Sequence, residues 1–309
     1  MSLSLNLPRL TTEKRNQKTY DLDILEIKQA LKIMNEEDQK VADAVKDMLP
    51  QIEVAIKEIV RRMKSGGRLL YLGAGTSGRL GILDAVECKP TFGVDDNMVK
   101  GIIAGGHNAM FHASEGSEDD EKQGKADLKE QGISSKDILL GIAASGRTPY
   151  VLGALKEANR EGAYTISLTC NQNSVISEYA QCAIEVVVGP EILTGSTRLK
   201  SATAQKMVLN MISTISMVQL GKVYQNLMVD VDVINSKLQQ RAIQIIMEAT
   251  NTSYEKAKEV MNLSGNNVKC AIVMIEARCT LQEAILAIQL ADEFTDKAIT
   301  IAKNHSNES

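Results

Sequence analysis

Three stretches of the sequence combine glycine with hydroxyl and basic side chains, a composition suited to binding an anion. In the first, "GAGTSGR", the residues Gly73, Gly75 and Gly78 have the G-x-G-x-x-G spacing. Between a strand and a helix, such a loop presents backbone N–H groups and the positive end of the helix dipole to a phosphate. The spacing alone is compatible with a dinucleotide site or with a plain phosphate cradle. The candidate ligand contacts of this loop are Gly75, Thr76, Ser77, Gly78 and Arg79.

A dinucleotide site needs one further feature, an acidic residue near the end of the second strand that binds the ribose hydroxyls. The second apolar run of the sequence ends instead in Ala104, Gly105 and Gly106. Because the expected carboxylate is missing, the first loop is better interpreted as a phosphate cradle.

Two more loops share this composition, "SGRTP" at Ser145–Pro149 and "TGSTRLKSATAQK" at Thr194–Lys206. A single loop of this kind is often only a structural turn. Three in one chain favour a shared sugar-phosphate site at the edge of a sheet where the strands end. The candidate contacts are Ser145, Gly146, Arg147 and Thr148 in the second loop and Ser196, Thr197, Arg198 and Lys200 in the third.

Acidic residues occur close behind the first loop and in one acidic run. Glu87 follows the first loop closely, and Glu118 lies in the acidic run 115–121. Taken alone, Glu87 is typical of an exposed helix surface and Glu118 of a solvated charge. Spacing does not distinguish Glu118 from its neighbour Glu115. A pair of carboxylates with raised pKa values could supply a general acid and a general base near neutral pH.

Composition narrows the class of partner. The 309 residues include 35 basic and 39 acidic ones, a net charge of −4, with 3% aromatic residues and no Trp. This disfavours a nucleic-acid surface, which needs basic fields and stacking rings, and favours a small-molecule partner. The five cysteines and three histidines lack metal-ligand spacing, so we expect no metal site. No secretory or membrane-spanning segment is evident, so we expect a cytoplasmic protein without membrane contact.

The elements that must position these residues form an alternating pattern. Five apolar runs of strand length occur, separated by turn signals and mostly by helical stretches. They are residues 68–72, 99–104, 137–143, 164–169 and 183–188. This alternation predicts an α/β fold with a mainly parallel five-stranded sheet covered by helices on both faces.

Helical patterns flank the predicted sheet on both sides. Residues 24–63 show helical periodicity, and the largely apolar stretch 199–221 predicts a long buried helix. Beyond residue 251 we expect three short helices, with capping boxes at Thr252/Glu255 and Thr280/Glu283. The expected boundaries are 1–45 for an N-terminal helical segment, 46–245 for a sugar-phosphate-binding domain, 246–302 for a three-helix module and 303–309 for a frayed tail.

Several long motifs resemble one known family. They are "YLGAGTSGRLGILDAVECKPTFG", "HASEGSEDD", "GIAASGRTPYV", "TGSTRLKSATAQKMVLNMIST" and "GKVYQNLMVDV". Together they resemble the SIS (sugar isomerase) domain proteins and, more closely, the N-acetylmuramic acid 6-phosphate etherase family. The resemblance extends from about residue 33 through the C-terminal helices. It implies a doubly wound SIS fold, a C-terminal bundle like ubiquitin-associated domains, a homodimer and no cofactor.

The resemblance also implies a reaction and roles for the two carboxylates. The family removes D-lactate from the C3 ether of its substrate by elimination and then adds water. Glu118 would take the proton from C2, while Glu87 would protonate the departing oxygen and later activate water. The alternatives are an aldose–ketose isomerase acting on a sugar phosphate and a non-catalytic sugar-phosphate sensor. Additional negative charge near a bound phosphate gains nothing for simple binding, which favours an enzyme.

The distance between Glu87 and the glycine loop raises a difficulty. On one unbroken helix, Glu87 would lie roughly 15 Å along the axis from Ser77, at about 1.5 Å per residue. That is too far for a sugar whose phosphate sits at the N-terminus of the same helix. Either the helix ends early, or Glu87 serves a site that a second subunit completes.

Overall fold

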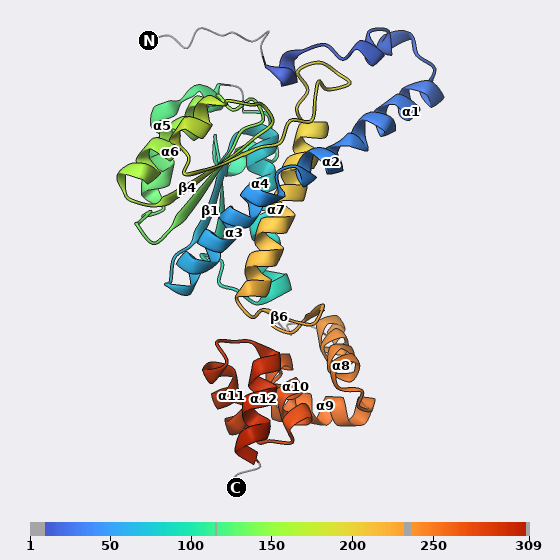
Figure 1. Cartoon of the computed structure of the whole chain (residues 1–309), viewed down its shortest axis with the longest axis vertical. Helices are drawn as coiled ribbons and strands as arrows, with labels where there is room; N and C mark the ends of the chain where they lie inside the picture. Colours follow the sequence, from blue (N-terminus) through green and yellow to red (C-terminus); the bar gives the residue numbers. More distant parts are fainter. Residues whose placement is uncertain (1–9, 115, 232–235, 307–309) are drawn as a thin grey trace. The chain divides into compact units, whose positions relative to one another are not determined.

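A computed structural model of the chain describes residues 10–114, 116–231 and 236–306 (Figure 1). The chain divides into two compact units. The first runs to Val86 and resumes from Asp96 to Ser213, and the second comprises Glu87–Asp95 and the residues from Thr214 onward. None of the helices within these described ranges is both long and apolar enough to cross a bilayer.

The first unit is built on a parallel sheet whose strands match the five apolar runs. In chain order they are β1 (Leu69–Gly73), β2 (Val99–Ile103), β3 (Ile138–Ile142), β4 (Tyr164–Thr169) and β5 (Cys182–Glu185). The strand order is β2-β1-β3-β4-β5, and every pairing is parallel. All residues of β1 and β3 are buried, as expected for strands covered on both faces. The predicted five-stranded sheet is confirmed.

Helices cover both faces of this sheet (Figure 1). On one face α5 (Glu121–Glu130) packs on α6 (Pro149–Arg160), and α6 contacts β1, β3 and β4. On the other face lie α3 (Leu49–Lys64), α4 (Gly75–Phe92) and the start of α7 (Lys200–Gln219). Gly81 of α4 lets that helix approach the sheet, since a Cβ there would lie 3.0 Å from Tyr71 Cβ. The predicted doubly wound α/β class is therefore confirmed.

An N-terminal segment is attached to the loops that precede α7. It contains short 3₁₀ turns (Thr11–Glu13, Gln17–Thr19 and Leu22–Ile24) followed by α1 (Ile27–Asp38) and α2 (Lys40–Lys46). Thr19 Oγ1 donates to the Ile192 carbonyl at 2.8 Å, and Asn171 Oδ1 accepts from the Thr11 N–H at 2.7 Å. These bonds join residues 173 and 160 positions apart in the chain.

The second unit is mainly helical. A two-stranded antiparallel ribbon, β6 (Val223–Tyr224) and β7 (Leu227–Met228), precedes its helices. The helices are α8 (Ser236–Thr250), α9 (Tyr254–Leu263), α10 (Val268–Ala277), α11 (Leu281–Leu290) and α12 (Thr295–Ser306). Their buried apolar residues form one continuous core. The capping box predicted at Thr280 and Glu283 is present.

The C-terminal module differs from the prediction in three details. Four helices, not three, follow residue 251 in the part of the chain that the structure describes. The additional helix, α12, buries Ala298, Ile299 and Ala302 on one face and carries the helix through Ser306, so residues 303–306 are not frayed. Residues 307–309 lie outside the described ranges. The N-cap of α9 is Ser253, which accepts from the Lys256 N–H, one residue later than predicted.

Candidate active site

Glycine is required at positions 73, 75 and 78 of the first loop by the local backbone geometry. Gly75, the first residue of α4, has φ +54°, a left-handed conformation that favours glycine. A Cβ on Gly73 would lie 2.8 Å from the Gly78 nitrogen, and one on Gly78 would lie 2.7 Å from the Gly73 carbonyl oxygen. The end of β1 and the first turn of α4 therefore touch backbone to backbone. This close turn leaves the first N–H groups of α4 at the carboxyl edge of the sheet, where an anion can bind.

Ser77 connects this first turn to α7. The serine is buried, and its Oγ donates a hydrogen bond to Oε1 of Gln205 at 2.9 Å. Thr76 is half-buried beside it, and Arg79 is half-buried one turn further along α4. The Arg79 guanidinium donates hydrogen bonds to backbone carbonyls of the segment that follows β2.

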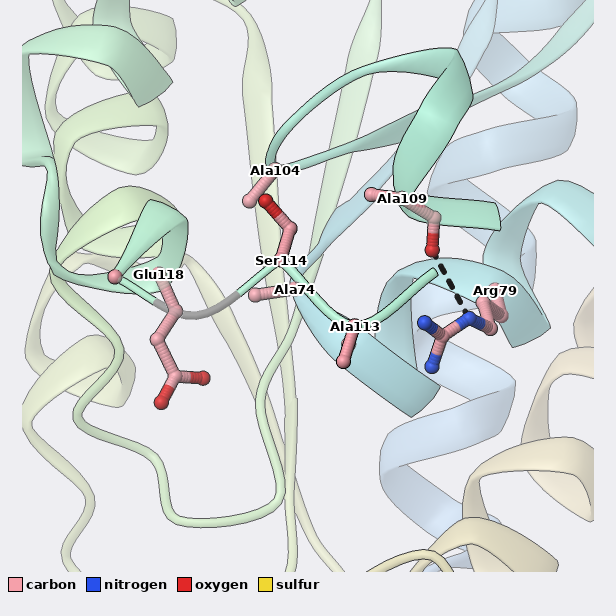
Figure 2. A pocket seen from close by; sticks show the side chains of 9 residues that line it. Ala74, Arg79, Ala104, Ala109, Ala113, Ser114 and Glu118 are labelled. Carbon is pink, nitrogen blue, oxygen red and sulfur yellow. Dashed lines mark hydrogen bonds between the residues drawn. The ribbon is translucent and has the colours of Figure 1, made fainter. Parts of the chain in front are cut away.

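A pocket of about 330 Å³ brings the glycine loop and Glu118 together (Figure 2). Its described lining includes Gly75 and Arg79 from α4, Ser114 and Gly116 from the segment after β2, and Glu118. Figure 2 shows Glu118 on one side and Arg79 on the other, with Ala74, Ala113 and Ser114 drawn between them. Glu118 is exposed and lies on the short 3₁₀ turn Ser117–Asp119. Its rival Glu115 lies outside the described residues.

The second hydroxyl loop joins β3 to α6. Gly146 has φ +70°, and Ser145 Oγ accepts a hydrogen bond from the Arg147 N–H at 3.3 Å. Thr148 is the N-cap residue and Pro149 the first residue of α6, a position where proline is favourable because no N–H bond is lost there. Ser145, Arg147 and Thr148 are partly exposed. The described lining of the 330 Å³ pocket does not include this loop.

The third loop leads into α7, whose N-terminal N–H groups already bind a carboxylate of the protein itself. The buried carboxylate of Glu191 accepts from the N–H groups of Lys200 and Ser201 at 3.0 and 2.9 Å. Lys200 is also buried, only 1% exposed, and its Nζ lies 2.8 Å from Oε2 of Glu37 in α1. The ammonium group predicted to bind phosphate is thus held by a protein carboxylate. Among the other predicted contacts, Ser196 and Thr197 are half-buried and Arg198 is exposed.

Glu87 lies on the exposed surface of α4 and belongs to the second unit. Helix α4 is continuous from Gly75 to Phe92, with Pro90 inside its last turn. The first of the two alternatives, an early end of the helix, is therefore wrong. The structure leaves the second alternative, a site completed by another subunit, as a proposal.

A buried polar cluster beneath the glycine loop is not evident from sequence spacing. Asp84 of α4 accepts from the Tyr71 hydroxyl at 3.0 Å and from Ser213 Oγ at 3.2 Å, and Lys206 Nζ lies 3.7 Å away. Burial raises the pKa of Asp84 above its ordinary value, although these hydrogen bonds and the lysine charge oppose the shift. The cluster joins β1 to α4 and α7, the two helices that begin after the first and the third hydroxyl loop.

No group of three or more His, Cys, Asp and Glu side chains within the described ranges is arranged to hold a metal ion. Among the described residues, the lining of the pocket offers backbone N–H groups, the hydroxyl of Ser114, the guanidinium of Arg79 and the carboxylate of Glu118. Such a set suits a phosphorylated ligand that undergoes proton transfer.

This fold and this loop arrangement define an SIS-domain protein. A family model for the N-terminal SIS domain of glucokinase regulatory protein matches residues 51–159, and the SIS domain model matches residues 121–215. A model for the C-terminal lid domain of glucokinase regulatory protein matches residues 225–265.

Curated relatives specify the family within this class. The chain is 55% identical over 293 residues to N-acetylmuramic acid 6-phosphate etherase of Shouchella clausii, covering 95% of this chain and 99% of that protein. It is 56% identical to the protein of that name from Bacillus cereus strain ATCC 10987, covering 95% and 100% of the two chains. It is 55% identical to N-acetylmuramic acid 6-phosphate etherase 2 of Lactiplantibacillus plantarum, covering 96% and 100%. The chain belongs to the N-acetylmuramic acid 6-phosphate etherase family, whose members are carbon–oxygen lyases.

Proposed function

We propose that this protein cleaves the lactyl ether of N-acetylmuramic acid 6-phosphate and releases D-lactate and N-acetylglucosamine 6-phosphate. One observation carries the proposal beyond family membership: Gly75 of the glycine loop and the Glu118 carboxylate line the same pocket. A phosphate bound at the loop would leave the sugar carbons within the space that Glu118 faces. Release of lactate from a phosphorylated amino sugar suits the recycling of peptidoglycan sugars.

The reaction is an elimination followed by an addition. An unactivated ether hydrolyses poorly, but opening of the sugar ring exposes a C1 aldehyde that acidifies the proton on C2. A base removes this proton, the electron pair forms the C2–C3 double bond, and the C3–O bond breaks. The departing oxygen takes a proton and leaves with lactate. Water then adds its oxygen to C3, and C2 regains a proton.

We assign the base to Glu118 and the acid, which later activates water, to Glu87. The N–H groups of Gly75 and Thr76 and the hydroxyls of Ser77, Ser145, Thr148, Ser196 and Thr197 are proposed ligand contacts, with Gly146, Arg147 and Arg198 beside them. Gly78, also predicted as a contact, shapes the loop without donating to the ligand, because its N–H already donates to the Ala74 carbonyl at 3.2 Å. Two predicted cationic contacts are left out of this set. The Lys200 ammonium group is paired with Glu37, and the Arg79 guanidinium is bonded to backbone carbonyls.

The position of Glu87 on an unbroken helix supports a homodimer in which each site uses Glu87 of the other subunit. A cytoplasmic location is part of the proposal, because no disulfide joins the cysteines of the described residues, as expected in a reducing compartment.

The decisive experiment is incubation with N-acetylmuramic acid 6-phosphate and assay for D-lactate. Release of lactate together with N-acetylglucosamine 6-phosphate would support the etherase. An isomerase would interconvert sugar phosphates without releasing lactate, and a sensor would bind the sugar phosphate without consuming it. Either of these results would overturn the proposal.

A further inference from the structure

Arg79 makes three contacts that a phosphate ligand does not explain. Its Nε donates to the carbonyl oxygens of Ala109 and Met110, at 3.1 Å each, and its Nη2 donates to the carbonyl oxygen of His112 at 3.1 Å. Figure 2 shows the guanidinium beside Ala109, with the first of these bonds drawn. All three acceptors belong to one short segment that follows β2.

These carbonyls lie at the end of a short helix and just beyond it. The 3₁₀ helix His107–Met110 is a single turn, so its last carbonyl groups lack partners within the helix. The backbone N–H groups of Phe111 and His112 both turn back to the carbonyl of Asn108. A side-chain cation at a helix C-terminus satisfies such carbonyls and also interacts favourably with the helix dipole.

Glu118 lies six residues after His112 in the sequence. From Ala104, which pairs with Gly73 at the edge of the sheet, the segment passes through Ser114 to the turn Ser117–Asp119. The segment folds back on itself, since a Cβ on Gly105, near its start, would come within 2.6 Å of Ser114 Oγ. Arg79 ties this segment to α4, whose first turn forms the proposed phosphate cradle.

We infer that Arg79 is a positioning residue that fixes the Glu118 segment relative to the glycine loop, and that it is not primarily a phosphate ligand. The inference rests on the proposed role of Glu118 as the base. A base must lie within hydrogen-bond reach of the proton that it removes, and a displacement of about 1 Å can reduce the rate about 10²-fold. By holding the segment through three carbonyls, Arg79 fixes the distance between the bound phosphate and the carboxylate.

The two roles of Arg79 predict different kinetics. A phosphate ligand contributes to substrate binding, so its loss would raise KM and leave kcat largely intact. A positioning residue acts on the alignment of the base, so its loss lowers kcat with little change in KM. Lysine can replace part of this function, since its ammonium group can donate to the same carbonyls without the planar fork of arginine.

The test compares Arg79→Met and Arg79→Lys with a matched control, Arg61→Met, on the exposed surface of α3. For Arg79→Met we expect a kcat for lactate release about 10²-fold below wild type with KM within about threefold, and an intermediate kcat for Arg79→Lys. Amide hydrogen exchange of residues 107–118 should accelerate in Arg79→Met while the strands stay protected. Arg61→Met should match wild type in each measurement.

Three outcomes would overturn the inference: a KM that rises tenfold or more with kcat preserved, unchanged kcat in both Arg79 variants, or unchanged exchange in residues 107–118. If Arg79→Met fails to fold, the KM, kcat and hydrogen exchange of Arg79→Lys test the inference in its place. Failure of the proposed function is recognised separately, because wild-type protein would then release no lactate. The exchange measurement tests the anchoring of the segment whether or not lactate is released.

Discussion

Ser77 Oγ donates a hydrogen bond to Oε1 of the buried Gln205 side chain at 2.9 Å, while the Nε2 group of Gln205 has no hydrogen-bond partner among the described residues. A buried amide N–H₂ without an acceptor costs free energy. The bond also uses the hydroxyl proton that Ser77 could otherwise give to a phosphate oxygen. Rotation of the Gln205 amide by half a turn would let Nε2 donate to Ser77 and would release that proton for a ligand.

The first prediction concerns this pair. Ser77→Ala should weaken substrate binding by about 0.5–1.5 kcal/mol, because one hydroxyl contact to the phosphate is lost. In the Ser77→Ala background, Gln205→Met keeps the volume and removes the unpaired amide without leaving a buried hydroxyl unpartnered, so the free energy of unfolding should equal or exceed that of Ser77→Ala. Titration with N-acetylglucosamine 6-phosphate measures the first effect, and urea unfolding measures the second. The exposed Ser65→Ala is the control. Unchanged affinity in Ser77→Ala would move the phosphate away from this loop.

The second prediction tests the base. Glu118→Gln should reduce kcat by roughly 10²–10⁴-fold and leave binding of the sugar phosphate nearly intact, because it removes a proton acceptor and no phosphate contact. Steady-state kinetics of lactate release, with affinity measured for the product, separates the two effects. Glu115→Gln is the matched control in the same acidic run. If Glu115→Gln loses activity and Glu118→Gln keeps it, the base has been assigned to the wrong residue.

The sequence predicts those parts of the site whose residues contact near neighbours in the chain, and not those that depend on contacts between distant residues. The glycine loop is predictable because its requirements are local: Gly73 and Gly78 approach each other across one turn, and Gly75 needs a positive φ. The roles of Arg79 and Lys200 are not predictable in this way. Arg79 bonds backbone carbonyls, which any residue supplies, and Lys200 pairs with a glutamate 163 positions away.

The elements of the fold are likewise predictable where a local pattern determines them and not where tertiary packing does. Five apolar runs predict five strands because strands buried on both faces must be continuously apolar. The pattern did not predict α12, whose buried residues Ala298, Ile299 and Ala302 are few and small. That helix is stabilised by packing on α10 and α11, a contribution that local periodicity underestimates.

The third prediction concerns the buried pair of Lys200 and Glu37. Lys200→Met should lower the free energy of unfolding by up to about 3–5 kcal/mol, because it removes the buried cation paired with the Glu37 carboxylate and leaves it with the more exposed Lys18 and Lys40. The double variant Glu37→Gln/Lys200→Met should lose less than the sum of the single variants. Urea unfolding measures both quantities. Lys57→Met, which breaks an exposed pair with Glu53, should show no measurable change. Additive losses in the double variant would contradict the coupling.

The same pair makes stability depend on pH. Burial alone would raise the pKa of Glu37, but hydrogen bonds from Lys200 and Lys40 outweigh it and lower the pKa to about 2, against an ordinary value of 4.5. Because the folded-state pKa is depressed, this stabilisation is fully present above pH 4.5 and is lost as the pH falls towards 2. Unfolding measured across this window should therefore be less pH-dependent in Glu37→Gln than in wild type. If the free energy of unfolding depended equally on pH in the two proteins, the lowered pKa of Glu37 would be contradicted.

The fourth prediction tests whether Glu87 acts across a dimer. Glu87→Gln and Glu118→Gln should each be inactive alone. After the two variants are unfolded, mixed in equal amounts and refolded, a shared site should restore about a quarter of wild-type activity, because half of the random dimers carry one intact site. Each variant carried through the procedure alone is the control. If the mixture stays inactive while native mass spectrometry shows mixed dimers, Glu87 acts within its own subunit.

The last prediction follows the atoms of the reaction. If the bond between C3 and the ether oxygen breaks, that oxygen leaves with lactate, and reaction in ¹⁸O-labelled water should place the label at C3 of the amino sugar and none at the lactate hydroxyl. In deuterated water the product should carry deuterium at C2, and substrate deuterated at C2 should react more slowly in ordinary water and lose its label. Mass spectrometry and proton NMR locate both isotopes. An isomerase would exchange the C2 hydrogen without releasing lactate. Direct displacement at C3 would introduce the oxygen label but has no reason to break the C2–H bond. Product with ¹⁸O at C3, its original C2 hydrogen fully retained and no rate difference for the deuterated substrate would therefore exclude the elimination, and with it the role assigned to Glu118.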